Sequence, residues 1–167
     1  DWVPDYDAPL VERLRAAGAV IMGKTNTPEL TLSFETDNLV YGRTNNPYDL
    51  SRTPGGSSGG AACGLATHML PVADGSDFMG SLRNPGAFNN VIGYRPSQGR
   101  VPGGGESDLF YQQMSTGGPM GRNSEDTIRL LHSIADYDSA QPLNLRDEIP
   151  PFEEFRARDL TGLKIGG

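Results

Sequence analysis

The run Pro54-Gly-Gly-Ser-Ser-Gly-Gly60 constrains the fold more than any other stretch of the chain. Its glycines let the backbone approach other segments closely and adopt dihedral angles that most residues avoid. Runs of glycine and serine usually form flexible linkers. Here, however, a stretch of small residues follows at once and predicts a closely packed helix over 58–68. The run is therefore predicted to be a tight loop at a helix start, a setting suited to a nucleophile or a bound anion.

Outside this run, helical patterns alternate with short apolar segments. The predicted helices cover 7–17, 58–68 and 124–135, with shorter helical turns after Pro28 and over 82–89. The predicted strands cover 19–22, 69–73 and 91–94, and a further strand is predicted to begin at Leu163. Long loops are predicted over 35–56 and 97–122, and a linker or surface excursion over 138–152. This alternation predicts a single α/β domain with a mixed, largely parallel sheet flanked by helices.

The composition argues against several partners and compartments. A length of 167 residues suits one domain, and 22 glycines with 13 prolines indicate a loop-rich chain or a piece of a larger one. The net charge of −7 argues against a nucleic-acid partner or an anionic membrane. No apolar run is long enough to span a membrane, and the first residues do not form a signal peptide. Because Cys63 is the only cysteine, a cytoplasmic location is favoured.

Residues 18–25, Gly-Ala-Val-Ile-Met-Gly-Lys-Thr, fit the spacing of a phosphate loop. Such a loop needs a strand before the first glycine and a helix that begins at the lysine. Here a predicted helix precedes Gly18, and the four residues between the glycines favour a strand. The next helix cannot begin before about Pro28. Nucleotide binding is therefore a minor alternative, and the simpler interpretation is a helix end, a buried strand and a loop.

A second serine in a glycine-containing loop, Ser81, follows Ser57 by 24 residues. The helix, strand and loop predicted between them would return the chain to the same edge of a parallel sheet, where open α/β folds bind their ligands. A serine nucleophile needs a proton acceptor. The sequence places neither His68 nor His132 beside these loops, so both histidines are expected to have packing or surface roles.

Five ordered motifs extend this pattern over most of the chain. They are GKTNTPE (23–29), YGRTNNPYDLSRTPGGSSGGAA (41–62), PVADGSD (71–77), GSLRNPGAFNNVIGYRPSQGRV (80–101) and STGGPMGRNSEDTIRLL (115–131). Together with the spacing of the two serines, this set resembles the amidase signature family from about Asp7 to Ala135, and again over 160–166. The resemblance implies the α/β fold of that family, of which this chain would hold a part.

The resemblance implies an unusual Ser-Ser-Lys triad. Ser81 would be the nucleophile that accepts the acyl group, and Ser57 would be the bridging serine, preceded by a cis peptide bond from Gly56. Ser58 would line the site and support the hydrogen-bond network. A loop of four residues would supply the backbone amides of the oxyanion hole: Phe78, Met79, Gly80 and Ser81.

Residues around that loop match the family with one departure. Asp77 and Arg83, with Pro85, are expected to hold the loop rather than to react. Met79 stands where a second glycine is usual. If this position needs a positive φ, methionine is strained there; if it needs only an outward N–H, the methionine side chain narrows the acyl pocket.

The lysine of the triad is expected to be missing from this chain. Lys24 and Lys164 are the only lysines, and in the family the base lies on a strand well upstream of the segment that holds Lys24. Lys24 is therefore expected to be structural. Because the chain has no initiator methionine and ends where a strand would begin, we expect an internal fragment that is inactive alone.

The resemblance implies an enzyme that hydrolyses a carbon–nitrogen amide bond by acyl transfer to Ser81. It implies a small-molecule amide substrate and needs no cofactor or metal. The alternative within the same resemblance is the amidase-type subunit of a tRNA-dependent amidotransferase. The particular amide and the oligomeric state, a homo-oligomer included, are left open by the sequence.

Overall fold

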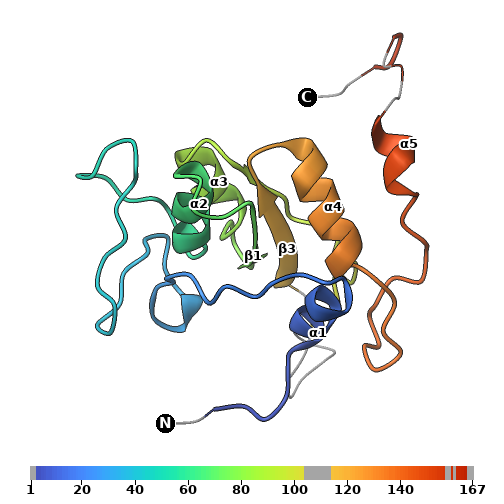
Figure 1. Cartoon of the computed structure of the whole chain (residues 1–167), viewed down its shortest axis with the longest axis horizontal. Coiled ribbons are helices and arrows are strands. Elements are labelled where there is room, and N and C mark those ends of the chain that lie inside the picture. Colours follow the sequence, from blue (N-terminus) through green and yellow to red (C-terminus); the bar gives the residue numbers. More distant parts are fainter. Residues whose placement is uncertain (1–2, 104–113, 157–158, 160, 165–167) are drawn as a thin grey trace.

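The computed structural model describes residues 3–103, 114–156, 159 and 161–164. Nine helices and strands follow one another within these residues (Figure 1): α1 (Pro9–Ala16), η1 (Glu29–Thr31), α2 (Gly59–Ala66), β1 (Val72–Asp77), α3 (Arg83–Phe88), β2 (Ile92–Gly93), β3 (Thr116–Gly121), α4 (Ser124–Ile134) and α5 (Phe152–Arg156).

The three described strands form one sheet in the order β1-β3-β2, and both pairs are antiparallel. Val72 lies opposite Gly121 at one end of the β1–β3 pair, and Asp77 lies opposite Thr116 at the other. The α/β class is confirmed. The prediction of a largely parallel sheet is wrong for the described strands.

Two segments explain this difference. The apolar segment 19–22, predicted to be a buried strand, forms no strand within the described chain and is exposed, with Val20 82% and Met22 79% accessible. Conversely, β3 lies within residues 97–122, which were predicted to form a loop because of their glycines. Close packing requires glycine at position 118, since a Cβ on Gly118 would lie 2.4 Å from the carbonyl oxygen of Tyr94.

The helices follow the predictions closely. α4 begins after Asn123, whose side-chain oxygen accepts the N–H of Asp126 and so caps the helix. Asp7 does not cap α1; it forms an ion pair with Arg15 instead. The segment 138–152 has an irregular backbone up to the start of α5. The sequence did not predict the helix α5. The strand predicted from Leu163 runs into 165–167, which lie outside the described residues.

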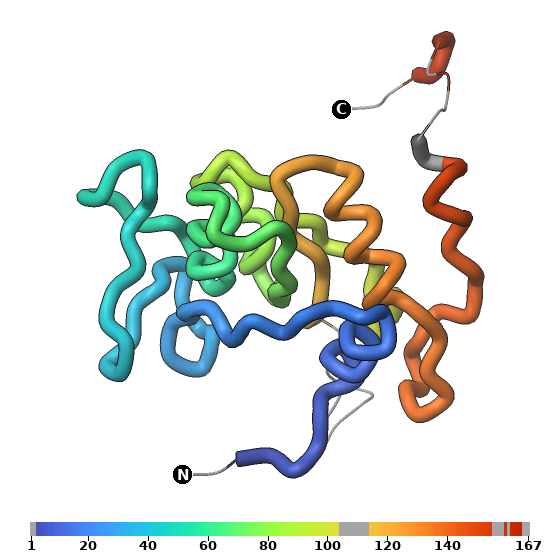
Figure 2. The backbone as a smooth tube through the Cα atoms, in the orientation of Figure 1, coloured from blue at the N-terminus to red at the C-terminus, as the bar shows by residue number. Residues whose placement is uncertain are grey.

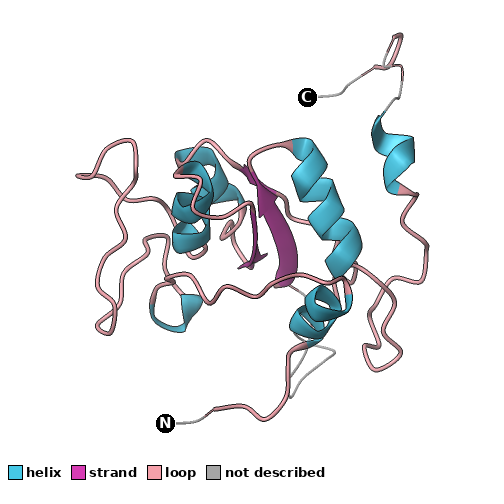
Figure 3. Cartoon of the chain, in the orientation of Figure 1, coloured by secondary structure: helices cyan, strands magenta, loops and turns pink. Residues whose placement is uncertain are grey.

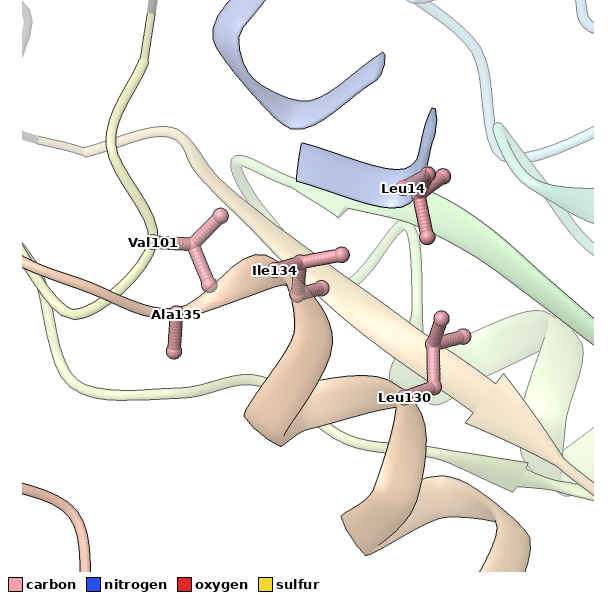
Figure 4. Close-up of a cluster of buried hydrophobic side chains, with 5 residues drawn as sticks. All are labelled: Leu14, Val101, Leu130, Ile134 and Ala135. Carbon is pink, nitrogen blue, oxygen red and sulfur yellow. The ribbon is translucent and has the colours of Figure 1, made fainter. Parts of the chain in front are cut away.

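Helices cover the sheet from two sides. Figures 1 and 3 show α2 and α3 on one side of the strands and α4 with α1 on the other. Figure 2 shows the extended segment after α1 crossing the molecule toward the loops on the α2 side. Each side has its own apolar core. One comprises Leu14, Val101, Leu130, Ile134 and Ala135 (Figure 4); the other comprises Ala61, Ala62, Leu65, Leu82 and Met120.

Candidate active site

The loop after β1 is folded around one buried carboxylate. Asp77 is the last residue of β1 and is fully buried. Its Oδ1 accepts the amide of Gly80 at 2.8 Å, and its Oδ2 accepts the amide of Leu82 at 3.2 Å. Gly80 has a φ of +121°, so the positive φ of this loop falls on a glycine. Ser81 lies between the two anchored amides and is 9% exposed.

Met79 fits this loop without backbone strain. It is not among the described residues with a positive φ, so the strain considered from the sequence does not arise. Its side chain is 62% exposed and that of Phe78 is 47% exposed. Both side chains therefore project outward from the loop, while the backbone around them follows the bonds to Asp77.

Two arginines hold the same carboxylate. Arg83 donates to Asp77 from Nε at 2.9 Å and from a terminal nitrogen at 3.0 Å. Arg95 donates to Oδ1 at 2.9 Å and to the Asp77 carbonyl, and its other terminal nitrogen donates to the carbonyl of Met114 at 2.7 Å. Burial alone would raise the pKa of Asp77, but the bonds from Arg83, the two amides and Arg95 outweigh it and hold the pKa well below its usual range.

Sequence reasoning missed Arg95. A signal was present, because the chain between Asp77 and Glu106 contains Arg83, Arg95 and Arg100 and no acidic residue. Arginines in such a stretch must find carboxylates elsewhere if they are to be paired. Asp77, the nearest acid before them, was the natural candidate.

The loop that carries Ser57 lies directly against the loop that carries Ser81. The Gly56–Ser57 bond is cis, so that prediction is confirmed. Ser57 and Ser58 are buried, at 2% and 5% exposed. The amide of Ser58 donates to the carbonyl of Ser81 at 3.2 Å, which joins the two loops through the backbone. Gly75 of β1 is packed on Ser58, since a Cβ there would lie 2.5 Å from the Ser58 Oγ.

The structure thus brings together every site residue predicted from the motifs. Ser57 and Ser58 reach the start of α2, and Ser81 reaches the same place from the loop after β1. Asp77 and Arg83 lie beneath the loop that carries Ser81. Among the described residues, the hydroxyls of the three serines take part in no hydrogen bond with another side chain or with the backbone.

The two lysines are not part of this cluster of side chains. Lys24 is exposed on an extended segment, and no helix begins there, so the geometry of a phosphate loop is absent. Two residues later the carbonyl of Asn26 accepts the amide of Gly60, so this segment passes beside the start of α2. Lys164 is exposed near the end of the described chain.

The histidines also lie elsewhere. His68 follows the last turn of α2, while the serines lie at its first turn, and eight helical residues separate these ends by roughly 12 Å. His132 packs edge-on against Phe152 and lines a cavity of about 670 Å³ between α4 and residues 147–150. Neither histidine is placed to serve the serines.

The described part of the chain offers neither a metal site nor a membrane span. Within the described ranges, no three His, Cys, Asp or Glu side chains gather as metal ligands would. No helix among the described residues has the length and hydropathy needed to cross a bilayer.

A cis-linked serine loop set against a second serine loop, itself built around a buried aspartate, points to one class of protein. The family model described as Amidase matches residues 1–167, and the chain belongs to that family. A curated relative is one of the subunits of the glutamyl-tRNA(Gln) amidotransferase of Microcystis aeruginosa (strain NIES-843). The chain is 43% identical to it over 166 residues, which cover 99% of this chain and 34% of that protein.

Solved structures agree with this assignment. A bacterial aryl acylamidase of the amidase signature enzymes superposes with a TM-score of 0.83 at 33% identity, over 87% of this chain and 30% of that one. The 6-aminohexanoate cyclic dimer hydrolase superposes with a TM-score of 0.83 at 34% identity, over 89% of this chain and 31% of that one. The chain spans about a third of the length of the curated relatives it matches.

Proposed function

We propose that the protein to which this chain belongs hydrolyses a carbon–nitrogen amide bond by acyl transfer. Ser81 is the nucleophile and Ser57 the bridging serine, with Ser58 in support. The amides of Phe78, Met79 and Ser81 form the oxyanion hole; Gly80, predicted as a fourth donor, instead gives its N–H to Asp77 at 2.8 Å. The observation that carries this proposal is the 3.2 Å bond from the Ser58 amide to the Ser81 carbonyl, which sets two buried serine loops side by side.

The chemistry follows from this arrangement. A base accepts a proton from the Ser57 hydroxyl, which takes the proton of Ser81 as its oxygen attacks the carbonyl carbon of the amide. The carbonyl oxygen gains negative charge and is held by the loop amides. The C–N bond then breaks, the amine leaves with the relayed proton, and water releases the acid from Ser81. The base is a lysine that the family pattern puts outside this chain, so this segment alone is inactive.

Asp77 and Arg83 support the loop without contacting the substrate in this proposal. With Arg95, they fix the amides of Gly80 and Leu82 on either side of Ser81. A fixed loop can meet the developing oxyanion without rearranging, which is where such sites gain most of their effect. The exposed Met79 side chain narrows the entrance on the acyl side.

The substrate is a small-molecule amide and no cofactor is required. A second candidate is the amidase-type subunit of a tRNA-dependent amidotransferase, which the 43% identity to an amidotransferase subunit favours. The net charge of −7 favours a role without direct nucleic-acid contact in either case. A cytoplasmic location belongs to the same proposal, since Cys63 is the only cysteine.

Labelling with a fluorophosphonate probe tests the proposal. In the full-length protein we expect one adduct by intact-mass spectrometry, mapped to Ser81. Ser81→Ala should abolish the adduct and lower amide hydrolysis by about 10³-fold or more, because the covalent step is lost. Ser76→Ala, five residues away on β1, is the matched control and should retain both. An adduct on another residue, or full activity of Ser81→Ala, would refute the assignment.

Purification separates the two candidates. A hydrolase should act on amides as a single polypeptide or homo-oligomer. An amidotransferase subunit should purify with other subunits and release ammonia from its amide donor to them.

A further inference from the structure

A buried side chain ties the Ser57 loop to the helix that follows Ser81. Asn89 follows the last turn of α3 and is fully buried. Its Nδ2 donates to the carbonyl of Pro54 at 2.6 Å and to the carbonyl of Pro85 at 2.8 Å. Pro54 lies three residues before Ser57, and Pro85 lies in α3, which begins two residues after Ser81, so one amide group joins the Ser57 loop to the helix that follows Ser81.

The backbone just before Ser57 is also closely packed against its neighbours. A Cβ on Gly55 would lie 3.1 Å from the Pro85 Cα, so the Ser57 loop packs directly on α3. The next carbonyl along, that of Gly55, accepts the hydroxyl of Thr36 at 2.8 Å. Thr36 and Asn89 therefore hold consecutive carbonyls ahead of Ser57. Of these two side chains, only Asn89 also bonds to α3, the helix that follows Ser81.

The side-chain amide hydrogens of Asn89 are fully used. Its Oδ1 lies 3.6 Å from the Cys63 sulfur, whose single proton has a nearer acceptor in the Asn45 carbonyl at 3.4 Å. Both amide hydrogens go to carbonyls. The Pro85 carbonyl also accepts the backbone amide of Asn89, whereas among the described residues the buried Pro54 carbonyl has only the Asn89 side chain as donor. Loss of this side chain would leave that carbonyl unpaired, a state that buried carbonyls avoid.

We propose that Asn89 is a positioning residue that sets the Ser57 loop against the Ser81 loop, an inference that rests on the proposed function. It touches neither serine hydroxyl. It fixes the backbone on which the proton relay depends, and relays of this kind lose about 100-fold in rate when a reacting group moves by about 1 Å.

The test compares Asn89→Leu with Asn144→Leu in the full-length protein. Asn144 is a matched control: its side chain also donates to a distant backbone carbonyl, that of Gly99, and contacts neither serine loop. The first readout is the rate of fluorophosphonate labelling at Ser81. The second is hydrogen exchange at the Ser58 amide, which reports on its bond to Ser81 whether or not the protein is active.

We expect Asn89→Leu to slow labelling by about 10- to 100-fold and to speed Ser58 exchange by about tenfold or more. Asn144→Leu should change both by less than about threefold. Unchanged rates in Asn89→Leu, or equal changes in both variants, would overturn the proposal. If Asn89→Leu does not fold, the smaller Asn89→Ser decides by the same criteria. If the unmodified protein is not labelled at Ser81, the proposed function is refuted, and exchange alone decides the role of Asn89.

Discussion

The two sides of the small sheet use the same kind of ion pair in different ways. On the side of α2 and α3, Asp77 is fully buried and is held by two arginine side chains and three backbone amides. On the side of α1 and α4, Asp136 pairs with Arg13 at 2.9 Å but is 70% exposed. The buried pair shapes a loop around itself, while the exposed pair joins the ends of two helices that already pack through Leu14 and Ile134 (Figure 4).

The difference shows where this fold depends on polar contacts. A buried carboxylate is stable only while its partners remain, so the loop after β1 must keep the shape that supplies them. The exposed pair can open without leaving a buried charge. The candidate site thus lies on the side whose geometry is fixed by hydrogen bonds, and the opposite side is held mainly by apolar packing.

Removal of the Asp77 charge should have the largest effect. Asp77→Asn leaves Arg83 and Arg95 without their counter-charge and should lower the free energy of unfolding by about 3–5 kcal/mol. Urea unfolding of the full-length protein at pH 7 measures this. A loss of unfolding free energy below about 1 kcal/mol is typical of an exposed ion pair, and it would contradict the difference drawn between the two sides of the sheet.

The pH dependence of that loss tests its cause. The folded-state pKa of Asp77 lies below the unfolded-state value of about 3.9. The stabilisation is therefore fully present above the unfolded-state pKa and is lost as the pH falls toward the folded-state value. The stability difference between wild type and Asp77→Asn should be constant from pH 7 to 5 and shrink from pH 4 to 3. A difference that stays constant down to pH 3 would exclude the charge as its source.

Two glycines of α2 offer an intermediate effect with a built-in control. A Cβ on Gly60 would lie 2.5 Å from both the backbone nitrogen and the backbone oxygen of Asn26, neither of which can move easily. A Cβ on Gly64 would meet only the flexible end of Leu70, at 2.8 Å. Gly60→Ala should therefore cost about 1–3 kcal/mol, while Gly64→Ala should stay within about 1 kcal/mol of wild type because alanine favours the helix.

Thermal and urea unfolding of the two alanine variants decide this point. Equal stabilities would mean that the segment carrying Asn26 moves away without cost, and that the start of α2 is less tightly packed than the site requires.

Patterns within one element were enough to predict part of this molecule. The small residues of 58–68 predicted α2, the apolar spacing after Asn123 predicted α4, and the ordered motifs predicted which loops meet. Contacts between a side chain and a distant carbonyl leave no such pattern. The bond from Asn89 to Pro54 joins residues 35 apart, and the one from Thr36 to Gly55 joins residues 19 apart.

The sheet was harder to predict than the site for a related reason. Strand prediction relies on apolar side chains, and the central strand β3 instead contains Gly118 and Gly121, where its neighbours approach too closely for a Cβ. The apolar segment 19–22 has the opposite character: its side chains are those of a buried strand, yet within the described chain they are exposed. Composition alone cannot tell which packing partner a segment has.

The smallest effect is expected on the side of α1 and α4. Asp136→Asn removes the charge that pairs with Arg13, but the carboxylate is largely exposed to water and the helices keep their apolar contacts. The loss in unfolding free energy should be about 0.2–1 kcal/mol and should diminish at 1 M salt, where exposed charges are screened. Salt should change the loss for Asp77→Asn much less, because that pair is buried. A loss at Asp136 as large as that at Asp77, or one that resists salt, would mean that exposure does not separate the two sides and that the α1–α4 contact depends on its ion pair as much as the candidate site does.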